Sequence, residues 1–152
     1  MSFTLSSPVL KDGQRMPEKY VHSNGDISPP LCWSNPPKDT KSFALLMEDG
    51  DAPLTTAGHW ILYNISCDEE ALPEKMPCDC ILGDGKLQGK NVFQKTGYLG
   101  PAPPWGEHTY VFRLFALDAV LPKLKNPKRK QLLKQIEGHI LDEARLSVVY
   151  KK

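Results

Sequence analysis

Long apolar runs are missing from this 152-residue chain. No stretch approaches the roughly 18 consecutive apolar residues that a membrane-spanning helix needs. The first residues, MSFTLSSPVLKDGQRM, also lack the apolar core of a signal peptide. We therefore expect no transmembrane segment and no export through a standard signal, and we expect a cytoplasmic protein.

A large excess of either charge is also missing, since the formal net charge is +1. A dedicated nucleic-acid-binding domain is usually strongly basic, so we expect no nucleic acid partner. The charges are unevenly spread, however: residues 121–152 hold nine of the 19 basic residues and three of the 18 acidic ones. The densest run, LPKLKNPKRK at 121–130, has two interpretations, a solvated entrance to a helix or a contact for an anionic surface.

Cysteine is scarce as well, with four residues at Cys32, Cys67, Cys78 and Cys80. In a reducing compartment four free thiols are the expected state. The C-x-C at 78–80 has no second close pair, so it is a weak zinc motif and no cofactor is expected. A disulfide from Cys67 to Cys78 or Cys80 stays open for an oxidising environment.

What the chain does contain is typical of one folded domain spanning residues 1–152. Its 40% hydrophobic and 24% charged residues are close to the globular average, and its length suffices for a hydrophobic core. The 14 prolines favour a β-rich fold with many shaped loops. No internal repeat divides the sequence.

Apolar patterning predicts five strands and one helix. The predicted strands are residues 2–10, 41–49, 59–66, 108–118 and 144–152. Strand 108–118 is nearly continuously apolar, which is typical of a strand buried on both faces. For the helix, Asn126 is the predicted cap and Pro127 the first residue, with Leu132, Leu133, Ile136 and Ile140 on one stripe and a possible end at Gly138. We therefore predict a mostly β fold with a helix near the C-terminus; residues 11–33 and 67–107 are expected to be rich in loops.

Two histidines stand at the start of a predicted strand, each after a loop rich in glycine and proline. His59 follows EDGDAP, and His108 follows GYLGPAPPWGE. If the two strands are neighbours, the imidazole rings face each other, and Asp49 or Asp51 is placed to hydrogen-bond one of them. Tyr110 shares a strand face with His108, because side chains alternate with a period of two. Imidazole, phenol and backbone N–H groups together would bind an anion.

Two other functions remain open for these residues. One is a small hydrolase in which His59 or His108 is the general base and Asp51 orients it, although no G-x-S-x-G or H-E-x-x-H motif supplies the rest of a known mechanism. The other is a metal site formed by His59, His108 and Asp51. Ligands on separate strands without a short spacing are weak evidence for that site.

The order of these segments resembles that of the phosphatidylethanolamine-binding proteins, also called the Raf kinase inhibitor protein family. EDGDAP is similar to the family signature D-P-D-A-P, and GPAPPWGEHTYVF is similar to its G-x-x-P-P…H-R-Y signature. The segments FTLSSPVLKDGQRMP, ISPPLCW, HWILYNI, GKNVFQKTGYLGP and EGHILDEARL resemble the small prokaryotic branch in the same order. This chain has Gly50 in place of the first proline and Thr109 in place of the arginine.

The resemblance implies a large antiparallel Greek-key sheet packed with a smaller sheet and few helices. It implies a non-catalytic binding or regulatory protein with a pocket for phosphate or a phosphorylated head group such as phosphorylethanolamine. A kinase or a protease is the implied protein partner, and a homodimer is compatible with the family. The implied pocket residues are Asp49, Asp51, His59, Gly100, Ala102, Pro103, His108 and Tyr110. The resemblance also raises the expectation that the Ala52–Pro53 peptide bond is cis.

Overall fold

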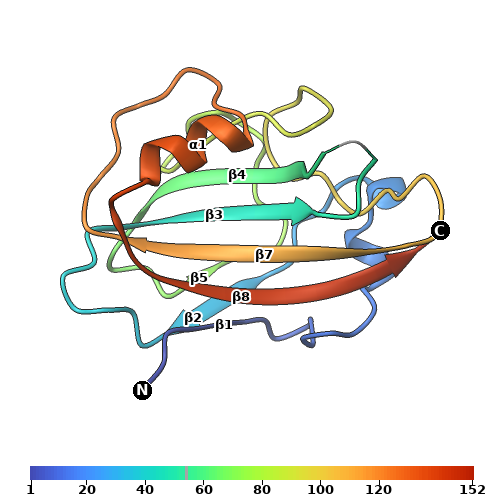
Figure 1. Ribbon diagram of the computed structural model, residues 1–152, viewed down its shortest axis with the longest axis horizontal. Helices are drawn as coiled ribbons and strands as arrows, with labels where there is room; N and C mark the ends of the chain where they lie inside the picture. The colour runs from blue at the N-terminus through green and yellow to red at the C-terminus, as the bar shows by residue number, and fades with distance from the viewer. Residues whose placement is uncertain (54) are drawn as a thin grey trace.

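The chain forms two antiparallel sheets, as the computed structural model shows for residues 1–53 and 55–152 (Figure 1). The larger sheet has the strand order β6-β4-β3-β7-β8, and the smaller has the order β1-β2-β5. The strands are β1 (Thr4–Ser6), β2 (Leu31–Ser34), β3 (Ser42–Asp49), β4 (Ala57–Ser66), β5 (Ala71–Leu72), β6 (Leu87–Gln88), β7 (Glu107–Leu117) and β8 (Ile140–Lys151). Helix α1 (Arg129–Ile136) lies beside β4 (Figure 1), and two short 3-10 turns span Glu18–Tyr20 and His22–Asn24. The predicted fold class, mostly β with two antiparallel sheets and a helix near the C-terminus, is confirmed.

Strand β3 runs through the middle of the molecule and is buried along its whole length. Its alternate residues belong to two different apolar clusters, as the period of a strand requires. Phe43, Leu45 and Met47 pack into the cluster shared with the small sheet, where the rings of Phe43 and Trp33 are 5.4 Å apart. Leu46 packs into the other cluster, on the side of α1.

Helix α1 covers the opposite face of the large sheet. Leu132 and Ile136 are fully buried there, in the same cluster as Ile61. The segment before the helix approaches the sheet so closely that a Cβ at Gly89 would lie 2.0 Å from the Pro127 carbonyl oxygen. The Pro127 carbonyl also accepts the Lys90 N–H at 2.9 Å, so the chain before the helix packs against the residues that follow β6. Within the described residues no helix is long and apolar enough to cross a membrane.

The predicted start of the helix was wrong by two residues: α1 begins at Arg129, not at Pro127. Lys128, not Asn126, is the N-cap, and Lys128 donates its backbone N–H to the side chain of Gln131 at 2.7 Å. Asn126 has a φ of 44°, which is left-handed and incompatible with a helical turn. Gly138, with a φ of 83°, follows the end of the helix as predicted, so Ile140 belongs to β8 and not to the helical stripe.

The first predicted strand is shorter than its apolar alternation indicated. β1 ends at Ser6, because the Ser7 hydroxyl accepts the backbone N–H groups of Val9 and Leu10 and turns the chain. Within the segment predicted to be loop-rich, residues 31–34 form β2 instead. This strand is too short for its alternation to be recognised among the prolines and glycines around it.

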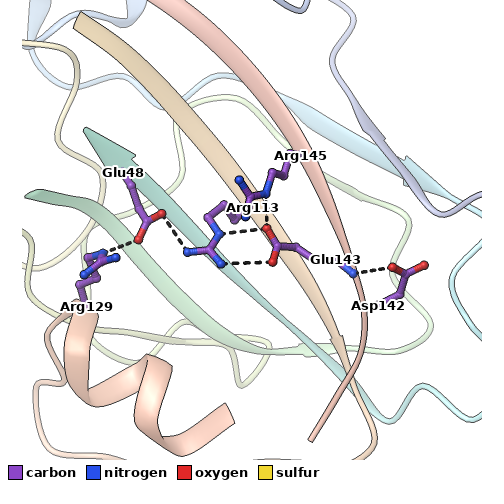
Figure 2. Close-up of polar contacts among 6 residues, drawn as sticks. All are labelled: Glu48, Arg113, Arg129, Asp142, Glu143 and Arg145. Carbon is purple, nitrogen blue, oxygen red and sulfur yellow. Dashed lines mark hydrogen bonds and ion pairs between the residues drawn. The ribbon is translucent and has the colours of Figure 1, made fainter. Parts of the chain in front are cut away.

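A network of five charged side chains joins α1 to three strands of the large sheet (Figure 2). Glu48 of β3, whose side chain is 9% exposed, accepts hydrogen bonds from Arg113 of β7 at 3.0 Å and from Arg129 of α1. Arg113 also binds both oxygens of Glu143, at 2.9 and 3.1 Å, and Glu143 pairs in turn with Arg145. Glu48 is therefore the link between the helix and the middle of the sheet.

Candidate functional site

Four of the predicted site residues meet at one end of the large sheet. Asp49 ends β3, while His59 lies near the start of β4 and His108 and Tyr110 lie near the start of β7. The two strands that carry the histidines are not neighbours, because β3 lies between them. Asp49 consequently stands between the two histidine-bearing strands and is paired in register with Tyr110. All four side chains are almost completely buried.

Asp49 and His108 form a buried pair. Asp49 Oδ2 lies 2.6 Å from His108 Nδ1. A carboxylate only accepts hydrogen bonds, so Nδ1–H is the donor, and Nε2 of His108 has no hydrogen-bond partner among the described residues. Asp49 Oδ1 accepts the backbone N–H of Asp51 at 2.9 Å. Both oxygens of Asp49 are therefore used to orient the histidine and the turn that follows β3.

His59 is held by the backbone of the loop that precedes β7. Its Nδ1 lies 2.9 Å from the Leu99 carbonyl oxygen, so Nδ1–H donates to that oxygen and Nε2 carries a lone pair. Burial lowers the pKa of His59 from its ordinary value, against the opposing effects of the Leu99 hydrogen bond and the negative charge of Asp49. His59 is therefore a neutral acceptor near neutral pH.

Tyr110 contacts both histidine rings. Its ring centroid lies 5.2 Å from that of His59 and 6.4 Å from that of His108. Its hydroxyl is buried and, among the described residues, has no hydrogen-bond partner of normal geometry. Burial and then the charge of Asp49 raise the pKa of Tyr110, so the hydroxyl keeps its proton. An unused donor is thus buried beside Asp49.

A cavity of about 200 Å³ opens onto this cluster. Asp49, His59 and Ala102 line it, together with Ala52, Pro53, Thr55, Ala57, Val92, Phe93 and Pro104. His108 and Tyr110 do not line the cavity but contact Asp49 and His59, which do. Val92 and Phe93 were missed by the sequence analysis because they fall in a segment without periodicity; both are about half exposed at the cavity wall.

Asp51 serves the site as a backbone anchor and touches neither histidine. It is exposed, and its Oδ2 accepts the backbone N–H of Thr109 at 2.9 Å. The turn after β3 is thereby tied to β7 through position 109, where this chain has threonine. Asp49 has the orienting role that the hydrolase hypothesis gave to Asp51. The expectation of a cis Ala52–Pro53 bond was wrong, since no cis peptide bond occurs in the described chain. The turn is shaped instead by the hydrogen bonds of Asp51 to Asp49 and to Thr109.

Gly100 and Pro103 are buried residues of the loop that precedes β7, and they do not line the cavity. Gly100 donates its N–H to Asp26 Oδ1 at 2.9 Å, and Asp26 also pairs with His22 at 2.9 Å. Asp26 lies in the segment 11–33, which was predicted only to be rich in loops, so this role was not foreseen. Asp26 therefore joins the N-terminal segment to the loop that holds His59.

The structure does not assemble the metal site considered from sequence. In the portion of the chain that is described, no group of three or more His, Cys, Asp or Glu side chains is placed to hold a metal ion. The four cysteines are free, so neither disulfide considered from sequence is present.

The pKa of His59 leads to a prediction about stability. In the unfolded chain His59 takes up a proton near its ordinary pKa of 6.5, whereas the folded protein resists this because the ring is buried. As pH falls below 6.5 the unfolded state gains protons that the native state does not, and stability is lost at up to about 1.4 kcal/mol per pH unit until the lowered native pKa is reached. In His59→Asn, the amide can still donate to Leu99 but does not titrate. We expect the free energy of unfolding of the wild type, minus that of His59→Asn, to decrease between about pH 8 and about pH 5 in urea titrations. A difference that does not change with pH would contradict the prediction.

The chain matches known proteins along nearly its whole length. The family model described as phosphatidylethanolamine-binding protein matches residues 6–151. A UPF0098 protein of Methanothermobacter thermautotrophicus is 40% identical over 148 residues, covering 97% of this chain and 98% of that protein. A UPF0098 protein of Chlamydia pneumoniae is 39% identical over 153 residues, with 97% and 98% coverage.

Solved structures agree with these matches. A phosphatidylethanolamine-binding protein homologue from Chlamydia trachomatis superimposes with a TM-score of 0.89 at 35% identity, covering 99% of this chain and 98% of that one. YbcL of E. coli, described as a member of the mammalian family, superimposes with a TM-score of 0.88 at 30% identity and the same coverage.

Proposed function

This chain belongs to the phosphatidylethanolamine-binding protein family, and on that premise we propose that it is a non-catalytic binding or regulatory protein whose 200 Å³ cavity takes a small anion. Phosphate or a phosphorylated head group such as phosphorylethanolamine is the ligand class. The observation that carries the proposal is the Nε2 of His59, whose ring lines the cavity while its Nδ1 is held by Leu99. A side chain fixed in this way presents one atom to a ligand without losing further conformational entropy.

Binding of such an anion is coupled to a proton. Neutral His59 Nε2 accepts hydrogen bonds, so it interacts favourably with a phosphate only if one proton lies between them. The proton comes either from solution, by protonating His59, or from a phosphate hydroxyl. In both cases the complex contains one proton more than the separate partners, neutral His59 and the phosphate dianion. The affinity for phosphate should therefore fall as pH rises, and sulfate, which has no titratable proton near neutral pH, should bind with proton uptake by the protein.

The test is calorimetric titration of wild-type protein with phosphate, phosphorylethanolamine and sulfate at about pH 6 and about pH 8. We expect saturable binding that is weaker at the higher pH. His59→Leu should weaken it about 10- to 100-fold, the loss expected for a charge-assisted hydrogen bond of about 1.5–3 kcal/mol. His139→Ala is the matched control, because His139 is exposed and pairs with Asp118 in another part of the molecule.

Two results would overturn the proposal. One is the absence of saturable heat for all three anions with folded wild-type protein. The other is wild-type affinity in His59→Leu, since that side chain supplies the atom on which the argument depends. Sulfate titrations in buffers of different ionisation enthalpy give the number of protons taken up, which separates a specific contact with His59 from general attraction of anions.

The hydrolase alternative receives little support from the geometry. Among the described residues that line the cavity, Thr55 carries the one hydroxyl and no thiol is present. His59 donates Nδ1–H to a carbonyl oxygen, so no carboxylate stands behind it as in a hydrolase triad. His108 does have a carboxylate, Asp49, at its Nδ1, but His108 does not line the cavity. We therefore propose that the cavity regulates by occupancy, with a kinase or a protease as the class of partner that the family suggests.

A further inference from the structure

A group of lysines gathers around α1 and the segment before it. We define the lysine patch as Lys90, Lys123, Lys125, Lys128, Lys130 and Lys134. Five of these are exposed and Lys90 is half-buried. Among the described residues none of the six forms an ion pair, whereas the neighbouring Arg129 is paired with Glu48 (Figure 2). The positive charge of the patch is therefore left uncompensated by the protein itself.

Three hollows run between these lysines and are connected by shared residues. The first, of about 260 Å³, is lined by Lys90, Lys128 and Lys130, and shares Gln131 with the second, of about 280 Å³. The third, of about 340 Å³, shares Leu124 and Lys125 with the second.

The hollows are not wholly polar. Leu124 is partly buried between two of them, and Ile81, 48% exposed, lines the third. The surface thus alternates cationic groups with recesses that contain an apolar side chain.

We propose that the lysine patch is a docking surface for an acidic segment of a partner protein. Glutamate or aspartate side chains would meet the lysines, and an apolar residue of the partner would enter the hollow at Leu124 and Ile81. Complementary charge of this kind raises association rates and selects partners more than it raises affinity. The interaction should therefore be transient and sensitive to salt, because exposed charges are screened within about 10 Å at 0.1 M ionic strength.

The geometry favours a protein segment over a membrane or a nucleic acid. Leu132 and Ile136 of α1 are fully buried, and Leu133, its third apolar residue, is partly buried against the same core, so the helix has no free apolar face to insert into a lipid surface. For nucleic acid, the patch lacks an exposed aromatic side chain on which bases could stack: the exposed Phe93 and Trp105 lie outside it. A short acidic segment needs neither feature.

The experiment measures fluorescence anisotropy of a labelled peptide made of glutamates with one central leucine, at low and at physiological salt. The patch variant is Lys123→Glu/Lys125→Glu/Lys134→Glu, and the matched control is Lys11→Glu/Lys38→Glu/Lys41→Glu, which changes net charge equally at exposed lysines elsewhere. We expect the wild type and the control to bind within about twofold of each other and the patch variant to bind at least about 10-fold more weakly. Circular dichroism and retained phosphate binding confirm that the variants are folded.

Four results would overturn the proposal. Absence of peptide binding at low salt removes the docking surface, and an equal loss in both variants means that only net charge matters. Tighter patch-dependent binding of single-stranded RNA or of vesicles containing phosphatidylserine would assign the patch to those ligands. A concentration-dependent dimer in light scattering that the patch variant abolishes would assign it to a second copy of this chain.

Discussion

Gly100→Ala is expected to destabilise the protein by about 3 kcal/mol or more and to abolish anion binding. A Cβ at this position would lie 2.4 Å from the Tyr20 carbonyl oxygen and 2.6 Å from the His22 backbone nitrogen. Both are backbone atoms, so the clash cannot be relieved by rotating a side chain. Relief requires the loop to separate from the N-terminal segment, which also displaces the neighbouring Leu99 carbonyl that holds His59.

Thermal and urea denaturation check the stability, and calorimetry with phosphate checks the site. The midpoint of thermal unfolding should fall by about 6–12 °C for a loss of that size in a chain of this length. Gly50→Ala is the control, because nothing lies within 4 Å of its added Cβ and its backbone is not left-handed. Gly50→Ala should change stability by no more than about 1 kcal/mol. If Gly100→Ala has nearly wild-type stability, the loop before β7 moves at little cost in free energy and is not rigid.

Glu48→Ala is expected to cost about 3–5 kcal/mol, the usual loss when one partner of a buried ion pair is removed. The Glu48 side chain is 9% exposed and is the one carboxylate in Figure 2 that meets both Arg113 and Arg129. Without it, Arg113 keeps Glu143, but Arg129 at the start of α1 loses its anchor on the sheet. The Arg113 side chain is 18% exposed, so its lost contact is only partly replaced by water.

Equilibrium unfolding of Glu48→Ala measures this loss, with Glu137→Ala as the matched control. Glu137 is an exposed glutamate at the end of the same helix and has no ion pair within the described structure. Glu137→Ala should stay within about 0.5 kcal/mol of the wild type. A loss below about 1 kcal/mol in Glu48→Ala would mean that the network in Figure 2 adds little to stability. In that event α1 would be held mainly by the apolar contacts of Leu132, Leu133 and Ile136.

Two consecutive residues of β3 lie next to the proposed site and next to the proposed docking surface. Glu48 and Asp49 are consecutive on β3, so their side chains point to opposite faces of the sheet. Asp49 orients His108 on one face, while Glu48 binds Arg129, which neighbours the lysine patch, on the other.

Local patterns in the sequence identified the long elements well. β3, β4 and β7 were predicted within one or two residues of their ends, because their apolar runs are long and bounded by turn residues. The short strands were missed or misjudged because two to four residues carry too little periodicity. The helix start was wrong because Asn126 adopts a left-handed backbone that a capping residue in its usual geometry does not have.

The sequence by itself pointed to four residues of the candidate site, since His59, His108, Asp49 and Tyr110 are recognisable from two short motifs beside strands, but it did not point to Val92 and Phe93 of the cavity wall. Tertiary structure alone decided their roles. The strand order placed β3 between the two histidine-bearing strands, so Asp49 and not Asp51 holds a ring. Burial keeps His59 neutral, and the hydrogen bond from its Nδ1–H to the Leu99 carbonyl leaves Nε2 as the acceptor. The physical reason is that hydrogen-bond partners 40 to 59 residues apart in the chain are set by sheet register and loop packing, which no local pattern encodes.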